Sequence, residues 1–363
     1  MPLQWDHTPL TSEYLLPAEW ANQSAIMLTW PHRQTDWADH LAEVDQVYLA
    51  ISRQVTRFQR LLIVCQNERH HKLISGKLAA AGIAPERLHF AIAPSNDSWA
   101  RDHAPLTCIG EKGALLLDFQ FNGWGGKYPA ELDTRINQQL FRAGVFAATE
   151  QRSVPLVLEG GAVETDGLGT LLATRSSVLT RSRNPDLTAD QVESILSQQL
   201  GFDRFLWLEH GHLSGDDTDG HIDTLARFAD PATILYATAT AEDPDYPELE
   251  AMAAELRAFR QRDGQPYRLI ALPPIPPILS KQGDRLPAGY ANFLIINGAV
   301  LLPVYNIPQD AAAIRALQAC FPQREIIPID CLPLIRQNGS LHCITMQFPA
   351  QVTLSPAEAS LPA

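Results

Sequence analysis

The sequence predicts an α/β protein, and three observations favour this fold class. Short runs of β-branched and aliphatic residues alternate with amphipathic helical patterns over nearly the whole length. The composition, 45% hydrophobic and 19% charged, is typical of a globular chain rather than a disordered one. A length of 363 residues suits a single large closed α/β architecture. We therefore expect one domain over residues 1–354 and a disordered tail over 355–363.

Strands are expected where apolar residues run together between turn signals. In chain order they are Ala25–Trp30, Arg60–Cys65, Leu88–Ala93, Gly113–Phe119, Thr170–Ala173, Phe205–Leu208, Ile222–Phe228, Ala232–Ala237, Arg268–Leu272, Ala291–Ile296 and Ala299–Tyr305. No identical residues recur at a fixed period, so any repetition is one of architecture rather than of sequence.

Helices are expected between these groups of strands. Over Leu41–Phe58, apolar residues recur at alternating steps of three and four, which predicts a helix with one buried stripe. The other helices are expected at Arg69–Ala81, Ala130–Ala143, Thr188–Leu200, Pro247–Arg260 and Pro308–Phe321. Pro273–Pro277 and Lys281–Pro287 are typical of connecting loops.

The charge of the chain limits its partners. The net charge is −13, and no run of Lys or Arg forms a basic stripe. Such a chain does not neutralise phosphates, so we expect neither nucleic acid nor a membrane as partner. A small cationic molecule is attracted instead, although an acidic pI of 5.3 by itself mainly keeps a chain in solution.

Cysteine usage and the first residues indicate a cytoplasmic protein. Residues 1–20 lack the pattern of a signal peptide, and the most apolar later stretch, Asn292–Tyr305, is interrupted by two polar or turn-forming residues. The cysteines have no spacing typical of a zinc ribbon or a disulfide framework; they are Cys65, Cys108, Cys320, Cys331 and Cys343.

Four polar clusters stand beside strand patterns, where a purely structural sequence has turns. Charged groups are rarely buried without partners, so clusters interleaved with Trp and apolar residues suggest a site. The clusters are Asn96–Asp102, Glu159–Gly161, His210–Asp223 and Asn338–Cys343.

The third cluster has three interpretations. As the start of a strand, it places His221 and Asp223 on one face and Ile222 on the other. As a solvated acidic loop, it accounts for the acids at its centre but not for these two residues beside an apolar run. As a metal site of an amidohydrolase, it offers ligands from among His210, His212, Asp217, Asp219 and His221.

Cys343 differs from the other cysteines in its polar surroundings. A single cysteine is most often a buried small hydrophobe, which is our interpretation of the other four. If Leu341–Phe348 is extended, Cys343 shares a face with Thr345 while His342 points away. His221 is then the better partner for the thiol.

Four motifs, in this order, resemble those of the agmatine deiminase and bacterial peptidylarginine deiminase family. They are Trp99–Asp102 (WARD), Glu159–Gly161 (EGG), Asp217–Asp223 (DTDGHID) and His342–Thr345 (HCIT). Further resemblance comes from Leu16–Trp20 (LPAEW), Trp30–His32 (WPH) and Asn122–Tyr128 (NGWGGKY). The chain departs from the family pattern at Asn338–Ser340, where a glycine run is usual, and at Met346.

The resemblance implies the pentein fold, an α/β propeller of five ββαβ-like units with pseudo-fivefold symmetry around a central pocket. It also implies hydrolysis of a guanidinium group without cofactor or metal. The reaction that the resemblance favours is the hydrolysis of agmatine to N-carbamoylputrescine and ammonia, a step of putrescine and polyamine biosynthesis. The family often forms homo-oligomers.

The resemblance also assigns roles to particular residues. Cys343 corresponds to a nucleophile, His221 to an acid and base, and Asp102 with Asp223 to ligands of the guanidinium. Further contacts with the substrate are expected from Glu159, Trp99 and Trp124, although Trp99 equally fits the core.

These residue types suit the chemistry of a guanidinium. The group is planar and charged, and its forked N–H donors let two carboxylates fix its plane. Its central carbon is a poor electrophile, so a thiolate must be held close to it. A nearby imidazolium or the bound cation lowers the pKa of a thiol below its free value of about 8.5. Arg101 is expected to support a carboxylate rather than to contact a cation.

Other functions stay open at this point. Free arginine or a peptide-terminal arginine could replace agmatine on the same fold, because the motifs do not identify residues that contact the far end of the substrate. A catalytically silent pentein would bind a guanidino compound without releasing ammonia.

Overall fold

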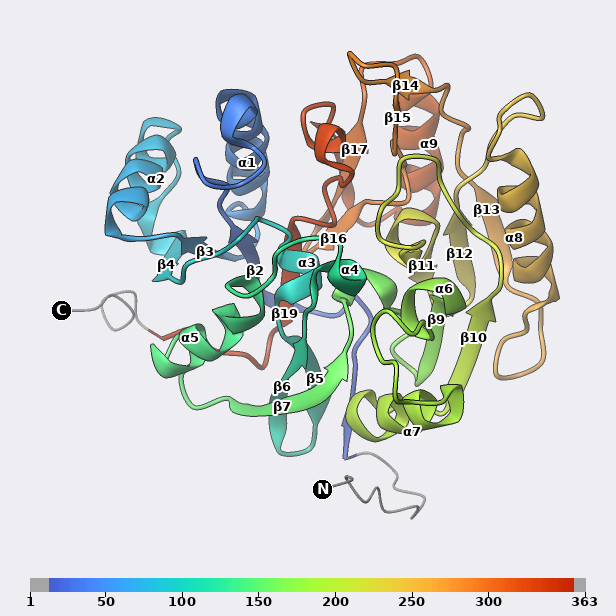
Figure 1. Cartoon of the computed structure of the whole chain (residues 1–363), viewed down its shortest axis with the longest axis horizontal. Helices are drawn as coiled ribbons and strands as arrows, with labels where there is room; N and C mark the ends of the chain where they lie inside the picture. Colours follow the sequence, from blue (N-terminus) through green and yellow to red (C-terminus); the bar gives the residue numbers. More distant parts are fainter. Residues whose placement is uncertain (1–12, 356–363) are drawn as a thin grey trace.

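The computed structural model describes residues 13–355. Helices and β-sheets alternate along this part of the chain, so the predicted α/β class is confirmed (Figure 1). No helix among these residues is long and apolar enough to cross a bilayer. Most of the predicted tail lies outside the described residues. Ser355, its first residue, is buried and donates its backbone N–H to the carbonyl of Val145.

Five sheets within residues 13–355 share one pairing pattern, in which two antiparallel strands are followed by a parallel strand reached through a helix. The first sheet joins β19 (Thr345–Pro349), β2 (Gln23–Thr29), β3 (Arg60–Cys65) and β4 (Leu88–Ile92), with helices α1 (Leu41–Val55) and α2 (Glu68–Ala80). The second joins β1 (Tyr14–Leu15), β5 (Leu106–Gly110), β6 (Gly113–Gln120) and β7 (Glu150–Val157), with α5 (Ile136–Arg142).

The other three sheets have three strands each. They are β8 (Glu164–Thr165), β9 (Thr170–Thr174) and β10 (Arg204–Leu208) with α7 (Ala189–Leu200); β11 (Ala226–Asp230), β12 (Thr233–Tyr236) and β13 (Arg268–Ala271) with α8 (Tyr246–Ala258); and β16 (Leu294–Ile296), β17 (Ala299–Val304) and β18 (Glu325–Asp330) with α9 (Asp310–Cys320). A separate hairpin pairs β14 (Ile278–Leu279) with β15 (Arg285–Leu286).

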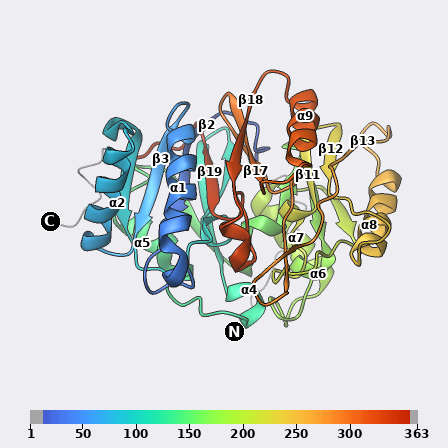
Figure 2. The same cartoon turned by 90° about the horizontal axis from the view of Figure 1, so that it is seen from above.

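Short helical segments lie between the longer elements, some within one sheet and others between two sheets. They are α3 (Ala100–His103), α4 (Gly123–Gly126) and α6 (Arg175–Val178), with the 3-10 turns η1 (Ala38–His40), η2 (Pro85–Arg87), η3 (Asp133–Arg135), η4 (Gly160–Ala162), η5 (Ile222–Thr224) and η6 (Leu334–Gln337). Figure 1 shows the longer helices α1, α2, α5, α7 and α8 around the outside, whereas α3 and α4 lie near the middle. Figure 2, seen from above, keeps α1 and α2 at one end of the molecule and α8 at the other.

The helices follow from patterns in the sequence. α1 buries Val44, Tyr48, Ile51 and Val55, which are spaced three or four residues apart and so lie on one side. α7 begins with a capping box at Thr188, a favourable N-terminus, and its C-cap, Gly201, adopts the left-handed conformation that glycine tolerates best.

Some predicted elements have different limits. The strand expected at Ile222–Phe228 begins only at Ala226, because residues 222–224 form the turn η5. The strand expected at Ala291–Ile296 begins at Leu294. The helix expected at Ala130–Ala143 is reduced to η3 and α5. The loop expected at Lys281–Pro287 contains β15, which pairs with β14.

Candidate active site

The predicted clusters meet at two glycines of η4. A Cβ atom on Gly160 would lie 2.2 Å from the carbonyl oxygen of Arg101 in α3. A Cβ atom on Gly161 would lie 2.5 Å from His221 Nδ1, 2.8 Å from Asp102 Oδ1 and 3.3 Å from Asp223 Oδ2. Only a residue without a side chain leaves room for these groups. The Glu-Gly-Gly motif is therefore explained by close approach, and the three predicted site residues surround one point.

Cys343 lies beside this cluster, in the turn that precedes β19. The structure therefore differs from the extended segment expected at Leu341–Phe348, whose strand starts at Thr345. The thiol is 6% exposed, and its Sγ lies 3.8 Å from Asp223 Oδ2 and 3.3 Å from Asn292 Nδ2. The Cys343 carbonyl also accepts the backbone N–H of Arg101, which ties this turn to α3.

The electrostatic environment of Cys343 favours the thiol over the thiolate. Burial, followed by the nearby carboxylates of Asp223 and Asp102, raises the pKa of Cys343 well above its ordinary value. Hydrogen bonds from the backbone of Ser340 and from the side chain of Asn292 oppose this rise only in part. The thiol thus needs an added positive charge to ionise near neutral pH.

Two buried carboxylates face the same region. Asp102 in α3 accepts hydrogen bonds from the indole N–H of Trp124 at 2.9 Å and from the backbone N–H of Gly161 at 3.0 Å. Burial, Asp223 and Glu159 raise the pKa of Asp102 well above its usual value. Asp223 in η5 is 1% exposed, and its Oδ1 has no hydrogen-bond partner among the described residues. A cation bearing N–H donors would satisfy these acids.

His221 lies between two acids at the base of the cluster. Its Nδ1 is 3.6 Å from Asp102 Oδ1, and its Nε2 is 3.9 Å from Glu159 Oε2. Burial lowers the pKa of His221 to about 3, so the free protein holds a neutral imidazole that is able to accept a proton. Glu159 is fixed from the other side by Arg183, whose Nε lies 2.9 Å from both carboxylate oxygens.

A cavity with an empty volume of about 470 Å³ opens above Cys343 and Asp102. Its walls include the aromatic rings of Trp99, Trp124 and Tyr128. Its outer part carries acids, and none of the described residues that line it is Lys or Arg; the acids are Asp36, Asp97 and Asp217. Both tryptophans expected to contact substrate therefore line the cavity, and Trp99 also packs into the core.

Several residues of this site were not predicted. The extended segment expected from the sequence turns His342 away from Cys343, whereas in the structure its ring contacts Asp223 at 2.8 Å and Glu19 at 2.7 Å. Glu19 belongs to the Leu16–Trp20 motif, and this motif is the one feature of the sequence that could have indicated its place in the site. Asn292 and Arg183 stand in no motif, so only the tertiary structure places them here. Arg101 lies 3.7 Å from Glu19, as expected of a residue that supports a carboxylate.

The candidate metal ligands have other partners. No group of three metal-ligating side chains converges within residues 13–355. His210 contacts Glu255 at 2.5 Å on the surface, and Asp219 pairs with Lys127 and Arg183. His210 and Asp219 are thus paired with other side chains, whereas His221 and Asp223 of the same cluster lie beside Gly161.

Known proteins resemble this chain over nearly its whole length. The family model for the Porphyromonas-type peptidyl-arginine deiminase matches residues 15–349. An agmatine deiminase of Stutzerimonas stutzeri is 31% identical, over 94% of this chain and 97% of that protein.

Two solved structures resemble this one closely. A provisionally assigned arginine deiminase from Porphyromonas gingivalis is 45% identical, with a TM-score of 0.86 over 93% of this chain and 99% of that one. A cysteine-to-serine variant of the C. jejuni agmatine deiminase, with substrate bound, is 33% identical, with a TM-score of 0.84 over 92% of this chain and 96% of that one. The chain thus belongs to the Porphyromonas-type peptidyl-arginine deiminase family.

Proposed function

We propose that this protein hydrolyses agmatine to N-carbamoylputrescine and ammonia through a covalent adduct on Cys343. The observation that carries the proposal is a buried thiol that lines an acidic cavity together with Asp102 and lies 3.8 Å from the buried carboxylate of Asp223. The agmatine deiminases among its relatives support the same reaction.

The guanidinium end binds between Asp102 and Asp223. The unpartnered Oδ1 of Asp223 accepts one of its N–H groups, and Asp102 accepts others from the opposite side. The bound cation also places a positive charge beside the thiol. It lowers the pKa of Cys343 by cancelling the two negative charges that raise it.

Two half-reactions follow. With the cation bound, neutral His221 takes the proton of the Cys343 thiol, and the thiolate attacks the guanidinium carbon. The bond to a terminal nitrogen then breaks, and His221 gives the same proton to the departing ammonia. A thiouronium-type adduct remains on the sulfur. His221 then takes a proton from water, and the resulting hydroxide attacks the same carbon. The carbon–sulfur bond breaks, the added oxygen releases its proton to solvent, and His221 returns its proton to the sulfur, which leaves the alkylurea and the Cys343 thiol.

The far end of the cavity favours an amine over a carboxylate. Agmatine ends in an ammonium, which Asp36, Asp97 and Asp217 attract. Free arginine and a C-terminal arginine place a carboxylate near these acids, with no lining Lys or Arg to receive it. We therefore favour agmatine over arginine as the substrate.

An ammonia-release screen over agmatine, free arginine and arginyl peptides tests this proposal. We expect kcat/KM for agmatine to exceed the others on the order of 10²-fold, because repulsion between like charges opposes the carboxylates. EDTA should leave the rate unchanged. Faster turnover of arginine, or loss of activity with EDTA, would contradict the proposal.

A pair of variants isolates the contribution of the cavity mouth. Asp36 lines the cavity and Asp39 does not, although both are exposed. Asp36→Asn should raise the KM for agmatine about two- to fivefold, the effect of one exposed charge pair, and Asp39→Asn should leave it unchanged.

A second prediction concerns the charge state of Cys343. Inactivation by neutral 2-chloroacetamide should be slow at pH 7 and faster as the pH rises, because the raised pKa leaves little thiolate. The cationic 2-chloroacetamidine should react about 10- to 1,000-fold faster, since an opposite charge within a few ångströms shifts a pKa by one to three units. Equal rates for the two reagents would show that the acids do not control the thiol.

We also propose that the five sheets form a propeller with pseudo-fivefold symmetry around the cavity. The recurring pairing of two antiparallel strands, a helix and a parallel strand supports it.

A cytoplasmic location is supported by the five cysteines, which are all unpaired.

A further inference from the structure

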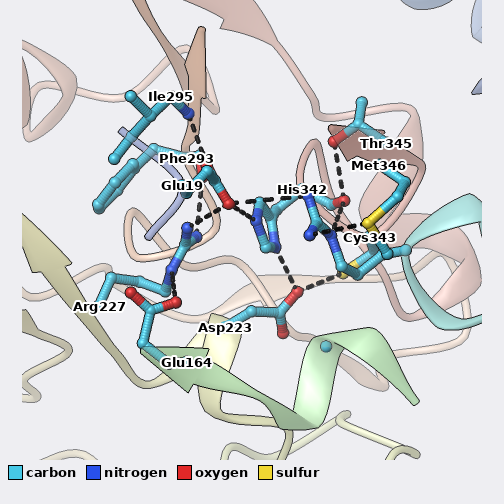
Figure 3. A network of polar contacts seen from close by, with 12 residues as sticks. Glu19, Glu164, Asp223, Arg227, Phe293, Ile295, His342, Cys343, Thr345 and Met346 are labelled. Atoms are coloured by element: carbon cyan, nitrogen blue, oxygen red, sulfur yellow. Dashed lines mark hydrogen bonds and ion pairs between the residues drawn. The ribbon is translucent and has the colours of Figure 1, made fainter. Parts of the chain in front are cut away.

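A buried row of three side chains lies behind the thiol. Figure 3 shows the ring of His342 between the carboxylates of Asp223 and Glu19. Its Nδ1 lies 2.8 Å from Asp223 Oδ2, and its Nε2 lies 2.7 Å from Glu19 Oε2. All three side chains are at most 7% exposed. None of the reaction steps described above uses His342 or Glu19.

The rear of this row is fixed by charge and backbone contacts. Glu19 Oε1 accepts the backbone N–H of Ile295 at 2.7 Å, and its Oε2 lies 2.9 Å from Arg227 Nη2. Arg227 is fully buried and also pairs with Glu164 at 2.7 Å. Burial alone would raise the pKa of Glu19, but Arg227 and His342 hold it below its ordinary value. Glu19 is thus a rigid, ionised acceptor.

The hydrogen bonds that His342 can form with its two carboxylate neighbours depend on whether its ring is protonated. A carboxylate accepts hydrogen bonds, and a neutral imidazole offers only one N–H. A carboxylate oxygen lies within 2.8 Å of each ring nitrogen, so a protonated ring donates to both acids and a neutral ring donates to one of them. Burial, Arg101 and Arg227 lower the pKa of His342, whereas Glu19 and Asp223 oppose that shift.

The contact between His342 and Asp223 determines which carboxylate oxygen of Asp223 stays free. Because His342 holds Oδ2, the other oxygen, Oδ1, stays without a partner and is available for the guanidinium. Asn292 links this arrangement to the nucleophile. Its Oδ1 accepts the backbone N–H of His342 at 2.8 Å, and its Nδ2 lies 3.3 Å from Cys343 Sγ.

We propose that His342 is a positioning residue that fixes the Asp223 carboxylate for guanidinium binding, using Glu19 as its anchor. His342 thereby holds the acid that binds the substrate, and the next residue, Cys343, carries the thiol that attacks it. The inference rests on the proposed function, in that the ligand of Asp223 is a guanidinium or an amidinium.

The test compares two substitutions of His342. His342→Phe keeps a ring but removes both donors, whereas His342→Asn keeps one short amide donor on the side of Asp223. His89→Phe, a buried histidine in β4 outside the site, is the matched control for loss of a buried imidazole. Inactivation by 2-chloroacetamidine and by 2-chloroacetamide is measured for each protein, with kcat and KM for agmatine.

The amidinium reagent reports on Asp223, and the neutral reagent reports on access to the thiol. We expect His342→Phe to slow the amidinium reaction on the order of 10²-fold, the cost of a carboxylate misplaced by about 1 Å. The neutral reagent should react no more slowly than with wild type. His342→Asn should fall between wild type and His342→Phe, and His89→Phe should match wild type.

Three results would overturn the inference. They are an unchanged amidinium rate, equal slowing of both reagents, and a His342→Asn protein no faster than His342→Phe. If His342→Phe does not fold, the test rests on His342→Asn. The ratio of its inactivation rate with the amidinium reagent to its rate with the neutral amide must then be lower than the ratio for wild type. Because alkylation needs no turnover, a wild-type protein that shows the amidinium preference but releases no ammonia from agmatine would refute the proposed function alone.

Discussion

Cys343→Ala is expected to lower kcat for ammonia release from agmatine on the order of 10⁴-fold or more, because the covalent route then has no nucleophile. The fold should persist, since alanine removes one sulfur from a turn that backbone hydrogen bonds hold to α3. Cys320→Ala, on α9 and only partly buried, is the matched control and should keep full activity. Ammonia release and mass spectrometry of trapped adduct provide the measurements.

Substrate binding separates this role from a structural one. Agmatine should still bind to Cys343→Ala, because Asp102 and the free oxygen of Asp223 are unchanged. If calorimetry detects no binding of agmatine to Cys343→Ala, the cysteine has a structural role in shaping the cavity. Substantial ammonia release by this variant would remove the thiol from the mechanism.

Gly161→Ala is expected to cause the second largest loss. The new methyl group would lie 2.5 Å from His221 Nδ1 and 2.8 Å from Asp102 Oδ1, so at least one of these groups must move. Displacements of this size in a catalytic arrangement cost on the order of 10²-fold in kcat/KM. Overpacking of this kind also lowers the free energy of unfolding by about 1–3 kcal/mol.

Gly76→Ala provides the comparison for Gly161→Ala. Gly76 lies in α2 with no atom within 4 Å of an added Cβ, so alanine should raise the free energy of unfolding by about 0.5–1 kcal/mol there. Thermal unfolding and ammonia release, measured on both variants, separate packing from catalysis. Full activity in Gly161→Ala would show that the three groups need not meet at this point.

The sequence was most informative where a local pattern decides the structure. The apolar run Arg60–Cys65 forms β3 with the predicted limits, because a strand buried among parallel neighbours needs apolar residues throughout. The stripe of α1 is equally local. The four motifs also indicated the residues around Gly161, since each motif keeps its chemistry within a few positions.

Two segments of the site were predicted with the wrong conformation. His221–Asp223 and Leu341–Ile344 were treated as extended, but both form turns. Gly220 precedes the first at φ 87°, and the hydroxyl of Thr224 donates to the His221 carbonyl and helps close that turn. Alternation along a short polar segment does not distinguish a strand from such a turn, whose shape depends on tertiary contacts.

Long-range partners could not be predicted at all. Glu19 and His342 are separated by 323 positions, and Asn292 carries no motif. Contacts at such separations depend on how whole sheets assemble, which no window of the sequence contains. Arg183 is a similar case, because its pairing with Glu159 joins two loops that look unrelated in the sequence.

The pairing of β19 with β2 also determines when the protein can become active during synthesis. Thr345 pairs with Leu28, so β2 is synthesised well before the strand with which it pairs. Until then, one edge of β2 has unpaired backbone groups, which are prone to join other chains. The turn bearing the thiol leads directly into β19, so a ribosome-bound fragment that stops short of this strand would carry the acids but no working nucleophile.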